Sequence, residues 1–259
     1  MAAKAIVFVH GMYMTPACRE KWRAYFAPLG YQCVAPAWPG RDRPVAVLRK
    51  EHPDSALGRL TLRAVLDHFE GEIRALREKP IVIGHSMGGL IAQLLLQRDL
   101  ASAAVAIDSA PPQGIITTKW SFVRANWPHI NPLALKARPI QLSFERFQYA
   151  FVNGLAPDQQ RTAFDAYVVP EWRRVPMESL TKVGHIDFAR PHAPLLLIAG
   201  SADHIIPAAL NRTMYRRYRR GASIKDFKEF PGRTHFIIGQ EGWEEVAGHA
   251  ASWLEQRVQ

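Results

Sequence analysis

The hexapeptide at residues 84–89, Gly-His-Ser-Met-Gly-Gly, constrains the fold more than any other feature of the chain. It lies between the apolar run 80–83 and the amphipathic run 90–96, so the pattern predicts a strand, a tight turn and a helix. A serine at such a turn has a strained backbone and an exposed hydroxyl, and glycines two residues to either side relieve the crowding. Ser86 is therefore a candidate nucleophile. The N–H of Met87, at the start of the helix, is a candidate donor to an oxyanion.

A second oxyanion donor is predicted near the N-terminus. The apolar run 5–9 is rich in β-branched residues and is followed directly by His10-Gly11-Met12. A loop that leaves the carboxyl end of a strand can direct a backbone N–H, here that of Met12, toward the position that Met87 also faces. The alternative is that His10-Gly11 only ends the strand.

An acidic residue follows the buried-strand pattern at 194–200. Asp203 lies just past its end, where the acid of a catalytic triad would orient an imidazole. Its other possible role is local, as a cap of the helix that begins at Pro207. Asp108 also ends a strand-like run and is the second candidate acid, although it could instead serve the proline-rich turn 110–112.

The position of His235 distinguishes it from the other nine histidines. It follows the last strand-like run, 224–230, in a loop marked by glycine and proline, and precedes the closing helix 243–257. We therefore predict that His235 is the general base. His10, His85 and His204 are expected to pack around the site.

Strand-like and helical runs alternate along most of the chain, which predicts a mostly parallel sheet of about six strands with helices on both faces. The strand-like runs are 5–9, 32–36, 80–85, 103–108, 194–200 and 224–230. A chain of 259 residues with 48% hydrophobic content can form one large α/β domain. The alternation stops between Gln113 and Arg190, where prolines and large aromatic residues gather. A connection of this length is not a bare loop.

These motifs and their order resemble the α/β-hydrolase superfamily over nearly the whole chain. The resemblance implies a catalytic triad of Ser86, Asp203 and His235, an oxyanion hole made by the N–H groups of Met12 and Met87, and no metal or organic cofactor. It also implies a core of residues 1–112 and 191–259, with a helical cap at 113–190. Aromatic residues of the cap would either line an apolar pocket or, for more than half of them, form the cap's own small core.

Within the superfamily, the short N-terminus and the stretch from Leu60 to His68 are similar to the plant-type esterase and hydroxynitrile lyase group and its bacterial relatives. The lyases of that group carry Thr after the His-Gly pair and Lys after the catalytic histidine. This chain has Met12 and Phe236 there, which favours ester hydrolysis. Epoxide hydrolases and haloalkane dehalogenases carry Asp at the position of Ser86, so they are disfavoured.

The leading functional hypothesis is a serine hydrolase that cleaves a carboxylic ester or lactone of a small, largely apolar substrate. A carbon–carbon bond hydrolase or a cofactor-free oxygenase could use the same triad. A small-molecule receptor without catalysis is the alternative outside enzymes.

Composition narrows the partners and the compartment. The formal charge of +10 includes a basic cluster at 216–220, but no nucleic-acid-binding motif accompanies it, and we expect a solvent-facing helix and no nucleic-acid partner. Neither a targeting signal nor a membrane span is expected, so the prediction is a cytoplasmic protein without membrane contact. Cys18 and Cys33 have no metal-ligand spacing and are predicted to be free thiols.

Overall fold

Six parallel strands form the single sheet of the protein, in the computed structural model that describes residues 4–53, 60–131, 139–218 and 223–258. Their spatial order is β2-β1-β3-β4-β5-β6, and every neighbouring pair is parallel. The strands are β1 (Ala5–Val9), β2 (Gln32–Val34), β3 (Ile81–His85), β4 (Ala103–Ile107), β5 (Leu195–Gly200) and β6 (Lys225–Phe230). The predicted fold, with about six mostly parallel strands, is confirmed.

The strand β1 matches its predicted run, and each of the other five strands is one or two residues shorter than predicted, for local reasons. Pro80 and Pro194 lie outside β3 and β5, because proline has no N–H for the ladder. The strand β4 ends at Ile107, because Asp108 has a left-handed backbone with φ of 42°. The four central strands are buried along almost their whole length, whereas β6 at the edge carries charged residues.

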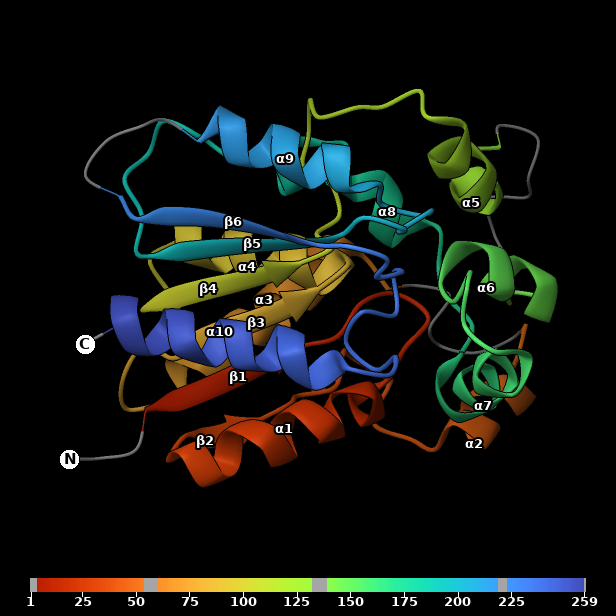
Figure 1. Cartoon of the computed structure of the whole chain (residues 1–259), viewed down its shortest axis with the longest axis horizontal. Coiled ribbons are helices and arrows are strands. Elements are labelled where there is room, and N and C mark those ends of the chain that lie inside the picture. The colour runs from red at the N-terminus through yellow and green to blue at the C-terminus, as the bar shows by residue number, and fades with distance from the viewer. Residues whose placement is uncertain (1–3, 54–59, 132–138, 219–222, 259) are drawn as a thin grey trace.

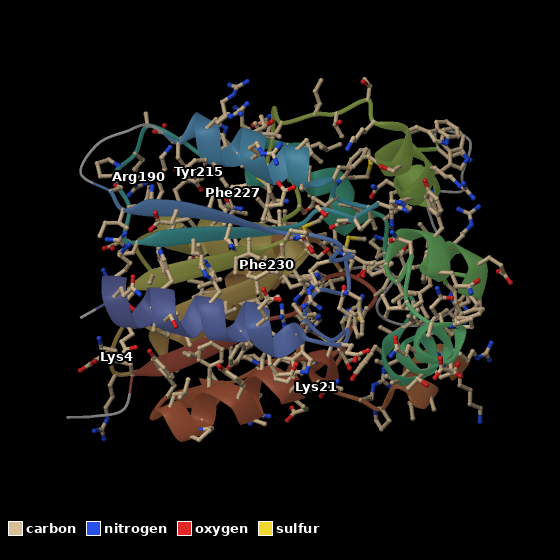
Figure 2. All side chains as sticks on the ribbon, viewed as in Figure 1. Lys4, Lys21, Arg190, Tyr215, Phe227 and Phe230 are labelled. Atoms are coloured by element: carbon tan, nitrogen blue, oxygen red, sulfur yellow. The ribbon has the colours of Figure 1, made fainter. Side chains whose placement is uncertain are left out.

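Helices cover both faces of the sheet (Figure 1). The short and long helices outside residues 113–190 are η1 (Pro16–Arg19), α1 (Glu20–Phe26), η2 (Ala27–Leu29), α2 (Val45–Lys50), α3 (Leu62–Arg74), α4 (Met87–Gln97), α9 (Ala208–Arg217) and α10 (Trp243–Arg257). In α3 the buried residues recur at helical spacing from Leu62 to Ile73, and the hydroxyl of Thr61 caps the first turn. Tyr215 of α9 packs against Phe227 of β6 in a tilted arrangement, with ring centroids 5.7 Å apart (Figure 2).

Residues 113–190 contain four α-helices and one 3-10 helix in their described part. These are α5 (Trp120–Ile130), α6 (Phe144–Ala150), α7 (Pro157–Tyr167), α8 (Arg174–Ser179) and η4 (Lys182–Gly184). The helices α5, α6 and α7 lie beyond the carboxyl ends of the strands (Figure 1). The loops that carry the candidate catalytic residues follow the carboxyl ends of the strands. The helices of segment 113–190 therefore lie next to these loops.

The structure also bears on the other predictions from composition. None of the helices in the described ranges is long and apolar enough to cross a membrane. Cys18 and Cys33 are free thiols. Of the basic cluster 216–220, Arg216 and Arg217 are exposed, whereas 219 and 220 lie outside the described residues.

Candidate active site

Ser86 occupies a sharp turn between β3 and α4. Its φ is 59° and its ψ is −123°, a conformation that non-glycine residues adopt rarely and only under strain. The turn requires glycine on both sides. A Cβ on Gly84 would lie 1.9 Å from the carbonyl oxygen of Gly88, and a Cβ on Gly88 would lie 2.3 Å from the carbonyl oxygen of Val9. The sequence pattern around Ser86 is therefore a steric necessity of the turn.

Two backbone N–H groups beside Ser86 have no acceptor among the described residues. They belong to Met87, the first residue of α4, and to Met12 in the loop after β1. The two loops approach each other closely at Gly11, where a Cβ would lie 2.7 Å from the Cβ of Ser86. Both methionines line the same pocket as Ser86. These are the two N–H groups that the sequence predicted for an oxyanion hole.

The imidazole of His235 donates a hydrogen bond from Nδ1 to Oδ2 of Asp203 over 2.6 Å, and both side chains are fully buried. The other carboxylate oxygen of Asp203 accepts from the backbone N–H groups of Ile205 and Ile206. Burial raises the pKa of Asp203, and these two N–H groups oppose that shift because they stabilise the ionised form. Asp203 therefore contacts His235 and also organises the loop before α9. It does not cap that helix, because the N-cap position is Pro207 and no side chain bonds to the first turn.

The second nitrogen of His235, Nε2, is buried and has no hydrogen-bond partner in the described part of the chain. The ring lies 4.7 Å from that of His85 and 5.0 Å from that of Phe151, measured between centroids. The structure contains no hydrogen bond between Nε2 and the hydroxyl of Ser86. Burial lowers the pKa of His235 to about 4, so the imidazole is neutral at neutral pH and can accept a proton.

Asp108, the second candidate acid, makes a different contact. Its Oδ1 accepts from the N–H of Gly200 over 2.7 Å, whereas Oδ2 has no partner among the described residues. Burial, followed by the nearby Asp203, raises the pKa of Asp108 well above its ordinary value. The side chain that bonds to Nδ1 of His235 is that of Asp203, whereas Asp108 bonds to the backbone of Gly200.

Asp108 also belongs to the one group of side chains in the described ranges that could hold a metal ion. One ring nitrogen of His85, one of His235 and one carboxylate oxygen of Asp108 lie within 4.8 Å of one another. A metal ligand must be deprotonated, and the raised pKa of Asp108 opposes this. We assign no metal to the group.

The three histidines that the sequence predicted to pack around the site have hydrogen-bond partners. His85 donates from Nε2 to the carbonyl oxygen of His235 over 2.8 Å. His10 donates from Nδ1 to its neighbour's carbonyl, accepts from the N–H of Trp38 at Nε2 and stacks on the indole. His204 bonds to the carbonyl of Tyr149. His85 thus fixes the backbone of His235 directly.

A pocket of about 90 Å³ opens beside Ser86. Its wall is mainly apolar and comes from the loops of the sheet and from the helices α5 and α8 of segment 113–190. The residues that line it are Met12, Tyr13, Ser86, Met87, Ala110, Pro111, Phe122, Asn126, His129, Ile130, Phe151, Pro176, Met177, Ser179, Leu180, Ile205 and Ile206. A larger hollow of about 550 Å³ lies between α5 and α6, but Ser86 does not line it.

One buried ion pair that sequence reasoning missed fixes the loop after β1. Glu171 accepts from Arg41 over 2.6 Å and from the backbone N–H of Tyr13 over 3.1 Å, and the side chains of the ion pair are 0% exposed. The carbonyl of Tyr13 accepts in turn from Val169. Tyr13 has a left-handed backbone, with φ of 62°. Because Glu171 and Tyr13 are 158 residues apart, no local pattern in the sequence indicates this contact.

Comparison with known proteins supports the fold. The profile of the alpha/beta hydrolase family matches residues 6–249. The chain is similar to the monoacylglycerol lipase of Paleococcus ferrophilus, with 21% identity over 98% of this chain and 94% of that one, and a TM-score of 0.70. A methylesterase from Arabidopsis is 13% identical over 97% and 99% of the two chains, with a TM-score of 0.67. A pyrethroid hydrolase from Sphingobium faniae is 17% identical over 97% of each chain, with a TM-score of 0.66. No curated protein matches the chain significantly.

Proposed function

The chain belongs to the alpha/beta hydrolase family, and from that premise we propose that it is a serine hydrolase that cleaves a carboxylic ester of a small, largely apolar substrate. The observation that carries the proposal is the setting of Ser86. This serine has a strained, left-handed backbone, lines an apolar pocket and lies beside the N–H groups of Met12 and Met87, which have no acceptor in the described part of the chain. Such a setting suits a reactive hydroxyl and a developing oxyanion.

The proposed reaction uses five residues. Nε2 of His235 takes the proton of Ser86, and the alkoxide attacks the carbonyl carbon of the ester. The N–H groups of Met12 and Met87 stabilise the oxyanion of the tetrahedral intermediate, while Asp203 stabilises the imidazolium. His235 then protonates the leaving alcohol, and an acyl group remains on Ser86. Water, activated by the same imidazole, releases the carboxylic acid and restores the serine.

The first proton transfer requires a hydrogen bond between Ser86 and His235. In many free enzymes such bonds are long or poorly aligned and tighten only when substrate binds. We infer the same here. Neither the hydroxyl of Ser86 nor Nε2 of His235 has a hydrogen-bond partner among the described residues, so a rotation of the serine side chain toward Nε2 breaks no existing bond.

Pocket size defines the substrate class. A volume of about 90 Å³ holds a short acyl or alkyl group, well below the ~300 Å³ or more of pockets for drug-sized ligands. The apolar wall favours uncharged substrates. The names of the similar structures, a monoacylglycerol lipase and a methylesterase among them, also support an ester as the substrate. A small lactone has the same reactive carbonyl and belongs to the same proposal.

A series of p-nitrophenyl esters tests this function. We expect kcat/KM to be highest for acetate and butyrate and to fall for hexanoate and octanoate, because the longer chains exceed the pocket. Ser86→Ala should abolish hydrolysis, whereas Ser102→Ala, a change before β4, should leave it intact. Absence of hydrolysis across the series and with small lactones would contradict the proposal.

A further inference from the structure

The pocket beside Ser86 contains one buried polar pair that the proposed reaction does not use. The phenol oxygen of Tyr13 lies 2.7 Å from Nε2 of His129, and both residues line the pocket. Tyr13 is 1% exposed and His129 is 4% exposed. The first comes from the loop after β1 and the second from the cap helix α5, so the pair joins the two halves of the pocket wall.

A count of hydrogens shows that this pair has one donor to spare. Burial lowers the pKa of His129 to about 3, so its imidazole is neutral and carries a single N–H. Burial also raises the pKa of Tyr13, so its phenol keeps its hydrogen. The pair therefore has two hydrogens, and the mutual hydrogen bond uses one. The other is either an N–H at Nδ1 of His129 or the O–H of Tyr13.

The spare hydrogen has no acceptor within the described chain. Nδ1 of His129 is buried and unpartnered, and the phenol of Tyr13 makes no second hydrogen bond. Two other polar side chains of the pocket wall already donate to backbone carbonyls, namely both amide hydrogens of Asn126 and the hydroxyl of Ser179. An unpaired buried donor is destabilising unless a ligand accepts from it.

The backbone around the pair is fixed, so the donor keeps its position. Glu171 and Val169 hold the N–H and the carbonyl of Tyr13. Arg173 donates to the carbonyl of His129 at the end of α5. The ring of Tyr13 also packs edge-on against Phe151, which in turn contacts His235. A donor held in this way near the reacting groups can select among substrates.

We propose that Tyr13 and His129 form a recognition site for a second oxygen acceptor on the substrate, so that the preferred substrates are small esters that carry a carbonyl oxygen in addition to the scissile one. This inference rests on the proposed function and specifies its substrate class. Ser86 and the oxyanion N–H groups engage the scissile carbonyl, while the spare hydrogen of the pair binds the other. Apolar walls between the two contacts accommodate a short alkyl linker.

Two matched pairs of esters test the inference, one with the second carbonyl in the acyl part and one with it in the alcohol part. One pair is p-nitrophenyl 4-oxopentanoate and p-nitrophenyl pentanoate; the other is 4-oxopentyl acetate and pentyl acetate. We expect kcat/KM of the oxo ester to exceed that of its plain partner by about threefold to tenfold in at least one pair, the contribution of one neutral hydrogen bond. A ratio of one in both pairs would overturn the inference.

Variants then assign the preference to the two residues. The double variant Tyr13→Phe/His129→Leu should bring the ratio to one, and each single variant should lower it. Tyr215→Phe, which removes a phenol hydroxyl between α9 and β6 (Figure 2), outside the pocket lining, should keep the wild-type ratio. A role in stability alone would lower the melting temperature and leave the ratio unchanged, and that result would refute the recognition site.

A binding measurement separates this inference from the proposed function and does not depend on the double variant being folded. In Ser86→Ala, ligand-observed NMR should give a dissociation constant about threefold to tenfold lower for hexane-2,5-dione than for hexan-2-one. Equal constants would overturn the inference, even where ester hydrolysis by the wild type stands. Tighter binding of the dione without ester hydrolysis in the wild type would instead overturn the proposed function alone.

Discussion

His235 and Asp203 form a hydrogen bond of 2.6 Å between two fully buried side chains that are 32 residues apart. The strands β5 and β6 bring them together, because the two residues follow these neighbouring parallel strands at the same edge of the sheet. Asp108 follows β4 at that edge too, but bonds to Gly200 instead. Because only Asp203 forms a hydrogen bond with His235, substitutions of the two carboxyl groups should differ in their effect on kcat.

Asp203→Asn should lower kcat by about 10⁴-fold, because the amide cannot hold the imidazole in the required tautomer or stabilise the imidazolium. Asp108→Asn should lower kcat by less than about tenfold, because an amide oxygen can still accept from Gly200 and the substitution leaves the hydrogen bond between Asp203 and His235 in place. Steady-state kinetics on p-nitrophenyl butyrate would measure both. If Asp108→Asn has the larger effect, the orienting role belongs to Asp108.

The pH dependence of hydrolysis should reflect the lowered pKa of His235. Only the neutral imidazole can accept the proton of Ser86, and burial lowers the pKa from 6.5 to about 4. We therefore expect kcat/KM to stay constant between neutral and mildly acidic pH. It should decline only as the pH falls through about 4. Enzyme held at each acidic pH and returned to pH 7 should regain full activity, which separates titration from unfolding. A midpoint near 6.5 would contradict the assignment.

Glu171→Gln should destabilise the protein strongly. Glu171 and Arg41 are both fully buried, and removal of one charge leaves the other without its partner, a change that costs about 3–5 kcal/mol. Glu20→Gln is the matched control, because Glu20 pairs with Arg23 at the surface, where an ion pair contributes at most about 1 kcal/mol.

Urea unfolding of the two variants measures both changes in the free energy of unfolding. Glu171→Gln should also lower kcat, because Glu171 holds the N–H of Tyr13, the residue after Met12. Equal, small effects of the two substitutions would show that the buried pair does not fix the loop.

The sequence alone was sufficient to predict those parts of the fold and of the candidate site that depend on a local residue pattern. The turn at Ser86 was predictable because Gly84 and Gly88 are required within five residues of one another. The order of strands and loops was predictable because Asp108, Asp203 and His235 each come in the loop after a strand-like run. Asp203 and His235 could therefore be expected at one edge of the sheet before any contact was known.

Long-range contacts of the helical segment 113–190 could not be predicted in the same way. Tyr13 and His129 are 116 residues apart, and His129 lies in a segment without a clear hydrophobic period. The aromatic residues there differ in role as well: Phe151 contacts His235, whereas Trp120 is 71% exposed. Composition alone does not distinguish such roles, because they depend on how the helices pack over the sheet.

Labelling with a fluorophosphonate probe tests the central claim most directly, since the probe reacts with a serine only when that serine is activated as a nucleophile. We expect the wild type and Ser102→Ala to be labelled at Ser86, as identified by peptide mass spectrometry, and Ser86→Ala to remain unlabelled. Labelling that persists in Ser86→Ala would contradict the account.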